Sequence, residues 1–91
     1  MSPDRHIVIA MTTAESAQTV RKIADLLRVA AFQRRITQGA IAKSAGLSRS
    51  AVSEYLNGHT AIPLSAYLDL CAALRINPND LLDEAQAGLS E

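Results

Sequence analysis

Four polar side chains with hydrogen-bonding groups lie close together in the segment that begins at Arg49. They are Arg49, Ser50, Ser53 and Glu54. An apolar stripe alternates with them at helical spacing and consists of Ala51, Val52, Tyr55 and Leu56. In a helix this pattern turns the stripe inward and the polar residues outward. The outward side then offers guanidinium donors, hydroxyl groups and a carboxylate acceptor to a polar partner.

The surrounding residues specify two short helices joined by a turn. Thr37 is a good N-cap for a helix that closes at Gly46, and Ser48 can cap the next helix, which closes at Asn57-Gly58. The small side chain of Ala42 lets the two helices approach each other. Four apolar residues are expected to fill the angle between them: Ile41, Leu47, Val52 and Leu56. The face that stays exposed has about the right size for a DNA major groove.

No arrangement of residues in the sequence predicts catalysis or metal binding. His6 and His59 are the only histidines, and the lone cysteine, Cys71, lies within an apolar stripe. There is no glycine-rich phosphate loop and no clustered pair of carboxylates. A metal site would need several convergent ligands. We therefore predict a protein that is not an enzyme, with no cofactor, no metal and no evident small-molecule ligand.

Charge is unevenly distributed along the chain, although the formal net charge is zero. Residues 21–49 carry seven basic side chains and one acidic side chain, a net charge of +6, whereas residues 50–91 carry −5. The basic residues are Arg21, Lys22, Arg28, Arg34, Arg35, Lys43 and Arg49. In one compact domain this distribution could give a positive face that attracts nucleic acid. On charge alone, solvated helix surfaces explain the pattern equally well.

Helical periodicity predicts an all-α fold of five helices in a single domain. The first helix is expected from Thr12, which forms a capping box with Glu15, to about Arg35. A fourth helix is predicted to start at Pro63 and a fifth after Asn77. The expected inward residues of the fourth helix are Leu64, Tyr67, Leu68, Cys71 and Leu74, and the fifth helix is expected to carry Leu81 and Leu82. The domain is predicted over residues 12–85, followed by a frayed tail at 86–91.

Residues 1–11 differ in kind, because the run from His6 to Met11 is rich in β-branched side chains. Such a run predicts a strand or an extended arm. An isolated strand must pair to satisfy its backbone groups, and a second copy of the chain is one candidate partner. An extension of the first helix, an arm packed on the same chain, and disorder are the alternatives.

The sequence also has no apolar run that approaches membrane-spanning length and no secretory signal at its N-terminus. A single cysteine excludes an internal disulfide. We therefore expect a cytoplasmic protein that has no membrane partner.

The stretch from Thr37 to Gly58 resembles the lambda-repressor-like family of helix-turn-helix proteins, which includes phage repressors, Cro proteins and many bacterial regulators. The shared features are Thr37-Gln38 at the start, Ala42, Gly46 at the turn, Leu47-Ser48, and Leu56-Asn57-Gly58 at the close. The likeness covers about residues 19–83, including the later pattern that ends at Leu82. It implies a helix-turn-helix domain in which the helix beginning near Arg49 reads the major groove.

The resemblance also assigns expected roles to individual residues. Arg49 and Ser50 fall where the family's main base-contacting residues lie, and Ser53 lies one turn further along. Gln38 would contact a phosphate and brace the start of the reading helix, and Asn57 would contact a phosphate. An arginine at this position can offer two donors to the O6 and N7 atoms of guanine. A contact to phosphate alone is the competing interpretation of Arg49.

Residues that flank this surface extend the predicted DNA-binding set to Lys43, Ser48 and Thr60. Further candidates for backbone contacts are Arg34, Arg35 and His59. The sequence departs from the family pattern at Gly39 and Ala40, where longer polar residues are frequent, and at Glu54, which adds a negative charge near the groove-facing surface. These departures bear on base preference and not on the class of protein.

Together these features predict a sequence-specific transcriptional regulator that binds double-stranded DNA in a bacterial or phage-infected cell. A repressor or Cro-like phage protein is favoured over an antitoxin, because no long toxin-wrapping tail follows the domain. A helix-turn-helix module that binds protein and not DNA is the alternative from another class. One short reading helix contacts few base pairs, so a homodimer is expected. Its candidate contacts are the segment His6 to Met11 first, and the acidic fourth and fifth helices second.

Overall fold

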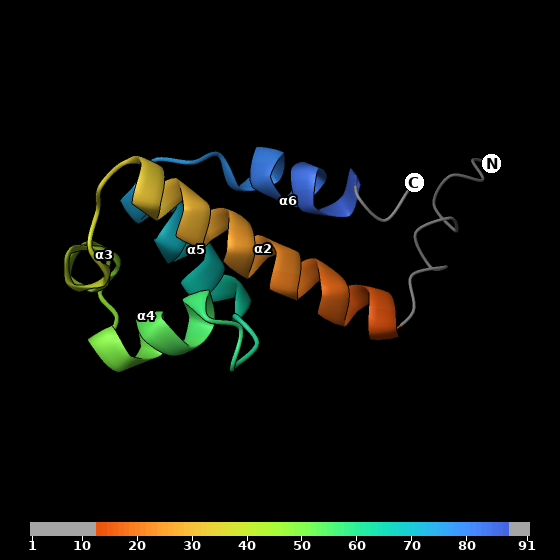
Figure 1. Ribbon diagram of the computed structural model, residues 1–91, viewed down its shortest axis with the longest axis horizontal. Coiled ribbons are helices and arrows are strands. Elements are labelled where there is room, and N and C mark those ends of the chain that lie inside the picture. Colours follow the sequence, from red (N-terminus) through yellow and green to blue (C-terminus); the bar gives the residue numbers. More distant parts are fainter. Residues whose placement is uncertain (1–12, 88–91) are drawn as a thin grey trace.

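The computed structural model describes residues 13–87, which form five helices and no strand (Figure 1). They are α2 (Thr13–Gln33), α3 (Gln38–Ala45), α4 (Arg49–Leu56), α5 (Leu64–Leu74) and α6 (Pro78–Ala87). The predicted all-α fold of five helices is confirmed. The predicted arm or strand at 1–11 and the expected cap at Thr12 lie outside the described residues.

The long helix α2 packs against three of the other four helices. α6 packs along α2 and runs in the opposite direction, and α4 and α5 also pack against α2 (Figure 1). α3 is held between α4 and α5 and lies at the end of the domain that is far from the start of α2. The two short helices therefore pack on each other, with α3 also held by α5 and α4 also held by α2.

Two helices end at arginines in the left-handed conformation that usually favours glycine. Arg35 follows α2 with φ at 57°, and the Ile36 N–H donates to the Ala31 carbonyl at 2.9 Å. Arg75 closes α5 in the same way with φ at 59°. This geometry satisfies the last carbonyls of a helix and turns the chain sharply. α2 accordingly ends at Gln33, two residues before the predicted end.

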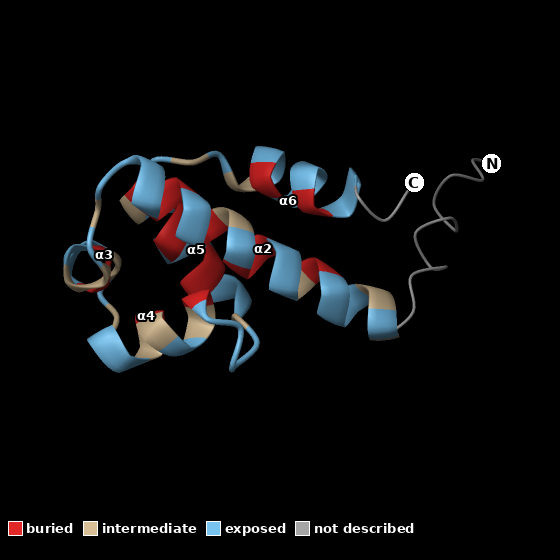
Figure 2. Ribbon diagram, in the orientation of Figure 1, coloured by how far each residue is buried: buried red, intermediate tan, exposed pale blue. Residues whose placement is uncertain are grey.

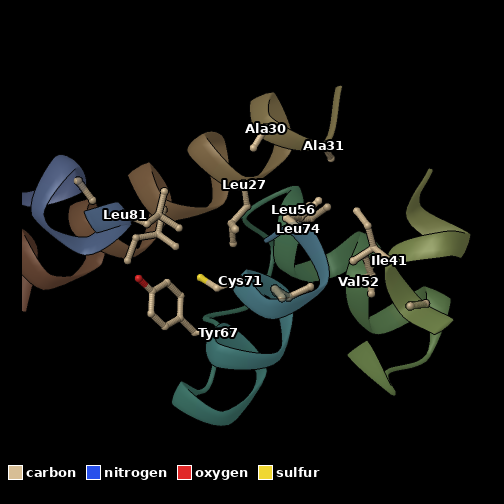
Figure 3. Close-up of a cluster of buried hydrophobic side chains, with 14 residues drawn as sticks. Leu27, Ala30, Ala31, Ile41, Val52, Leu56, Tyr67, Cys71, Leu74 and Leu81 are labelled. Atoms are coloured by element: carbon tan, nitrogen blue, oxygen red, sulfur yellow. The ribbon is translucent and has the colours of Figure 1, made fainter. Parts of the chain in front are cut away.

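The core is built from aliphatic side chains of all five helices (Figure 3). The largest fully buried side chains are Leu27, Ile41, Leu56, Leu70, Leu74, Val52 and Cys71. The prediction that Leu64 and Leu68 face the core is wrong, because they are 71% and 46% exposed. The buried side of α5 is centred on Leu70 and Leu74. At about 100° per residue around the helix, Leu64 and Leu68 lie outside this buried side.

Tyr67 and Cys71 lie side by side within this core, beside α6 (Figure 3). The Tyr67 hydroxyl donates to the Pro78 carbonyl. Burial raises the pKa of Tyr67 to about 12, and burial also raises the pKa of the Cys71 thiol. Both side chains are therefore neutral core residues at physiological pH.

The last helix begins as predicted. The Asn77 side-chain carbonyl accepts from the backbone N–H groups of Asn79 at 2.8 Å and Asp80 at 3.2 Å, which are otherwise unpaired donors at a helix start. α6 continues to Ala87, two residues past the predicted domain boundary. Leu81 is buried, whereas Leu82 is 36% exposed and lies at the edge of the helix interface.

Candidate nucleic-acid interface

The turn between α3 and α4 is fixed by two side-chain caps and one glycine. The Thr37 hydroxyl accepts from the Ala40 N–H at 3.1 Å, and the Ser48 hydroxyl accepts from the Ala51 N–H at 3.0 Å. Gly46 has φ at 73°, a conformation that costs most other residues about 1 kcal/mol or more. Each cap typically contributes about 1 kcal/mol to helix stability. The local sequence therefore sets where each helix starts and how the chain bends between them.

The angle between the two helices is filled as predicted. Ile41 and Val52 are completely buried, Leu56 is 1% exposed, and Leu47 packs partly buried against them. On the same side of α4, Ala51 and Tyr55 are only half-buried. This packing fixes the orientation of α4 on the domain, so the remaining side of α4 faces outward.

Four of the eight residues predicted to contact DNA lie on the outward side of α4 or at its C-cap. Figure 2 shows the start of this helix as exposed. Arg49, Ser50 and Asn57 are exposed and Ser53 is half-buried. The Asn57 amide donates to the Ser53 hydroxyl at 3.3 Å, which links two successive turns of this face. The structure thus brings Arg49, Ser50, Ser53 and Asn57 together along one convex polar surface.

Arg49 extends from α4 toward the start of α3. Its guanidinium group lies over Gly39, since a Cβ atom built on Gly39 would be 3.9 Å from Arg49 Nε. Gln38, the first residue of α3, is half-buried next to this glycine. The departure from the family pattern at Gly39 therefore leaves an uncrowded surface beneath the Arg49 side chain.

The remaining predicted residues surround this face. Lys43 is exposed in the last turn of α3, and Ser48 is exposed while its hydroxyl caps α4. The Thr60 hydroxyl donates to Glu54 Oε1 at 2.7 Å. A hydroxyl has one proton to donate. A phosphate contact by Thr60 would therefore require this bond to break, and in the structure Thr60 holds the Glu54 carboxylate.

One residue that positions α4 was not singled out by sequence analysis. Arg28 Nη1 donates to the Leu56 carbonyl at 2.7 Å, and Arg28 Nη2 pairs with Asp25 Oδ1 at 2.6 Å. The guanidinium of Arg28, which lies on α2, therefore caps the C-terminal end of α4. In the sequence, Arg28 was one of seven basic residues in the positive segment, and nothing local distinguishes it from the other six.

The other three carbonyls in the last turn of α4 have backbone partners. They accept from the N–H groups of Asn57 at 3.0 Å, Gly58 at 3.2 Å and His59 at 3.0 Å. Leu56 alone depends on a side chain from another helix. A cation at this end of a helix also interacts favourably with the partial negative charge of the helix dipole.

Within residues 13–87, no group of three or more potential ligands could hold a metal ion. Among the same residues, no helix is both long and apolar enough to cross a membrane.

Comparison with known proteins identifies the domain. A family model described as a helix-turn-helix domain matches residues 22–85, which include both caps and the glycine of the α3–α4 turn described above. No significant match to the chain was found among curated proteins or among solved structures. The family match begins within α2, so the first nine residues of α2 precede it. The chain belongs to the helix-turn-helix domain family of the Cro-like type that its sequence resembles.

Proposed function

We propose that this protein is a sequence-specific regulator of transcription that binds operator DNA as a homodimer and represses the genes beside it. The observation that carries the proposal is the convex polar face of α4, with Arg49 and Ser50 exposed at its capped start. Major-groove recognition needs side chains of this kind at an exposed helix start. The family match supports DNA binding in general. A DNA-binding role also favours a cytoplasmic location in a bacterial or phage-infected cell.

Charge supports the same interface. Arg34, Arg35, Lys43 and Arg49 are all exposed in the region of the α2 end, α3 and α4. Arg28 is committed to the end of α4 and to Asp25, so it does not add to the cations available for phosphate. Each phosphate contact contributes about 0.9 to the slope of log affinity against log salt. We therefore expect the logarithm of the affinity to fall roughly linearly as the logarithm of the salt concentration rises.

Selection of bound sites from random duplex DNA, followed by a fluorescence anisotropy titration, tests the proposal. The selected sites should be palindromic, because a two-fold dimer places its reading helices about 34 Å apart on one face of the duplex. Sedimentation of the protein on a selected site should give two chains per duplex. Absence of any preference over bulk DNA at moderate salt would refute the proposal.

Two variants separate base reading from backbone contact. Arg49→Ala should cost about 1–3 kcal/mol on the selected site and relax preference at one position per half-site. Asn57→Ala should weaken selected and random DNA more nearly equally, because a phosphate contact carries no base information. Arg75→Ala, which removes an arginine from the end of α5, is the matched control and should change neither affinity. If Arg49→Ala weakens both kinds of DNA by one factor, Arg49 is a phosphate contact.

A protein-binding module is the second candidate function, and one observation favours it. Phe32 is 83% exposed near the end of α2, and Val29, one turn earlier on the same side, is 48% exposed. Large exposed apolar side chains that lie together often mark a protein contact. The DNA titration separates the two candidates, since this alternative predicts no site preference.

A further inference from the structure

A carboxylate lies at the centre of the exposed face of α4. Glu54 follows the buried Val52 by two positions, which is roughly 200° around a helix with 3.6 residues per turn. It therefore lies on the side of α4 that is opposite to the core. Ser50 lies one turn earlier on the same side, because residues four apart share a face of a helix. Glu54 is exposed and forms no ion pair within residues 13–87.

The loop after α4 holds Glu54 at two points. The His59 N–H donates to the Glu54 backbone carbonyl at 3.0 Å, and the Thr60 hydroxyl donates to Glu54 Oε1 at 2.7 Å. Gly58, whose φ is 77°, turns the chain before these two residues. The other carboxylate oxygen, Oε2, has no hydrogen-bond partner within residues 13–87. The bond from Thr60 restricts the Glu54 side chain before any ligand binds, which lowers the entropic cost of binding.

A carboxylate held on a DNA-reading helix selects for hydrogen-bond donors and against acceptors, because an ionised carboxylate can only accept. In the major groove, cytosine presents its N4 amino group, whereas guanine presents two acceptors and thymine presents an acceptor and a methyl group. Adenine also has an amino group, but its N7 acceptor lies beside that group and repels a carboxylate. Phosphate groups carry the same charge as Glu54 and are repelled as well. Cytosine is therefore the base that fits this side chain.

We propose that Glu54 is a specificity-determining residue that accepts a hydrogen bond from the N4 amino group of one cytosine in each half-site, and that Thr60 positions it. The inference rests on the proposed function, because it requires α4 to lie in the major groove. Oε2 contacts the base while Oε1 keeps its bond to Thr60. Glu54 lies five residues after Arg49, a rise of roughly 7.5 Å at 1.5 Å per residue. This rise exceeds the spacing of about 3.4 Å between neighbouring base pairs, so the two side chains read different base pairs.

Site selection and anisotropy titrations with full-length variants test the role of Glu54. Glu54→Gln replaces the carboxylate with an amide, which can pair with both N6 and N7 of adenine. Its selected sites should therefore carry adenine in place of cytosine at one position per half-site and keep the other positions. Glu54→Ala should lower the discrimination between cytosine and other bases at that position by about 5- to 20-fold, the effect of one hydrogen bond to a charged group.

Both Glu54 variants should also bind random DNA about 2- to 5-fold more tightly, because a negative charge near the phosphates is removed. Lower discrimination together with tighter binding separates a specificity role from damage to the fold, which would weaken binding to all DNA. Glu84→Gln is the matched control, since it removes an exposed carboxylate from α6, which packs on α2 and α5. It should change neither the discrimination nor the affinity for random DNA.

Two substitutions test the positioning role of Thr60. Thr60→Val keeps the shape of the side chain and removes its hydroxyl, whereas Thr60→Ser keeps the hydroxyl. Thr60→Val should lower the discrimination for cytosine by about 2- to 5-fold and leave the affinity for random DNA unchanged, because Glu54 keeps its charge. Thr60→Ser should retain the discrimination of the wild type. In a Glu54→Ala background, Thr60→Val should have no further effect, because the two changes remove the same interaction.

The base preference of the Glu54 variants decides the proposal. Loss of cytosine preference in Glu54→Ala and a change from cytosine to adenine in Glu54→Gln support it. Unchanged preference in both variants overturns it, while a site selected by the wild type leaves the proposed function standing. Equal losses on selected and random DNA for Thr60→Val overturn the positioning role and make Thr60 a phosphate contact. If the wild type selects no site at all, the proposed function itself is wrong.

Discussion

Arg28 is the residue whose removal best tests how α4 is held on the domain. We choose Arg28→Met, because methionine keeps an unbranched apolar stem and removes only the guanidinium group. The change eliminates the 2.7 Å hydrogen bond to the Leu56 carbonyl and the 2.6 Å pair with Asp25. The Leu56 carbonyl then has water as its remaining partner, whereas the rest of the last turn keeps its backbone bonds.

The expected cost follows from these two interactions. A hydrogen bond from a charged donor contributes about 1.5–3 kcal/mol when it is shielded. The Arg28 side chain is 47% exposed, so solvent screening reduces this to roughly 1–2 kcal/mol. The pair with Asp25 is exposed on both sides and adds at most a few tenths of a kcal/mol. We expect the free energy of unfolding to fall by about 1–2 kcal/mol.

Urea denaturation measures this cost, and a salt titration on DNA separates it from phosphate binding. Asp25→Asn is the control and should change stability by less than about 0.5 kcal/mol. Because Arg28 is engaged within the protein, Arg28→Met should weaken operator binding but leave the salt slope unchanged. Lys43→Met should lower the slope by about 0.9 if Lys43 contacts phosphate. Unchanged stability, or a lowered salt slope for Arg28→Met, would refute the assigned role.

Three further predictions concern stability and are measured by urea denaturation. Arg75→Gly should raise the free energy of unfolding by about 0.5–1 kcal/mol, because glycine adopts the left-handed conformation without steric cost; a loss would show that the Arg75 side chain makes a stabilising contact. Gly39→Ala should also raise it by about 0.5–1 kcal/mol, since the added Cβ finds ordinary contact distances and alanine favours a helix; destabilisation would mean that Arg49 cannot adjust. The folded pKa of Tyr67, raised to about 12 from 10.0, predicts stability that is fully present below pH 10 and falls as pH rises from 10 to 12. Tyr67→Phe should lose about 1 kcal/mol at neutral pH with the Pro78 hydrogen bond and should lack this part of the alkaline slope; an identical slope in both proteins would contradict the assignment.

Local signals in the sequence were sufficient to predict the helices and the turn between α3 and α4. Caps such as Thr37 and Ser48 act within three residues, and Gly46 acts on its own backbone. The inward positions Ile41 and Val52 follow from helical periodicity alone. These features depend on neighbours along the chain, so a single sequence contains them.

The features that sequence analysis missed depend on contacts between distant segments. Arg28 and Leu56 are 28 residues apart, and their hydrogen bond exists only because α2 and α4 pack together. Leu64 has the periodicity of a core residue, but its exposure is set by where α2 and α6 leave α5 uncovered. Likewise, no local rule predicts that Arg35 and Arg75 take positions that usually favour glycine.

The contacts around α4 indicate how its exposed face is prepared for a ligand. Arg28 fixes the C-terminal end, Ser48 fixes the N-terminal end, and the Thr60 hydroxyl holds the Glu54 carboxylate. Side chains that are already ordered lose less conformational entropy when they bind. Arg49 differs, since its guanidinium lies over Gly39 and has no hydrogen-bond partner within residues 13–87. Helix α4 is fixed at both ends, and on its exposed face the Arg49 guanidinium remains available to bind a base. Base preference should therefore depend more on Arg49 than on any other residue of this face.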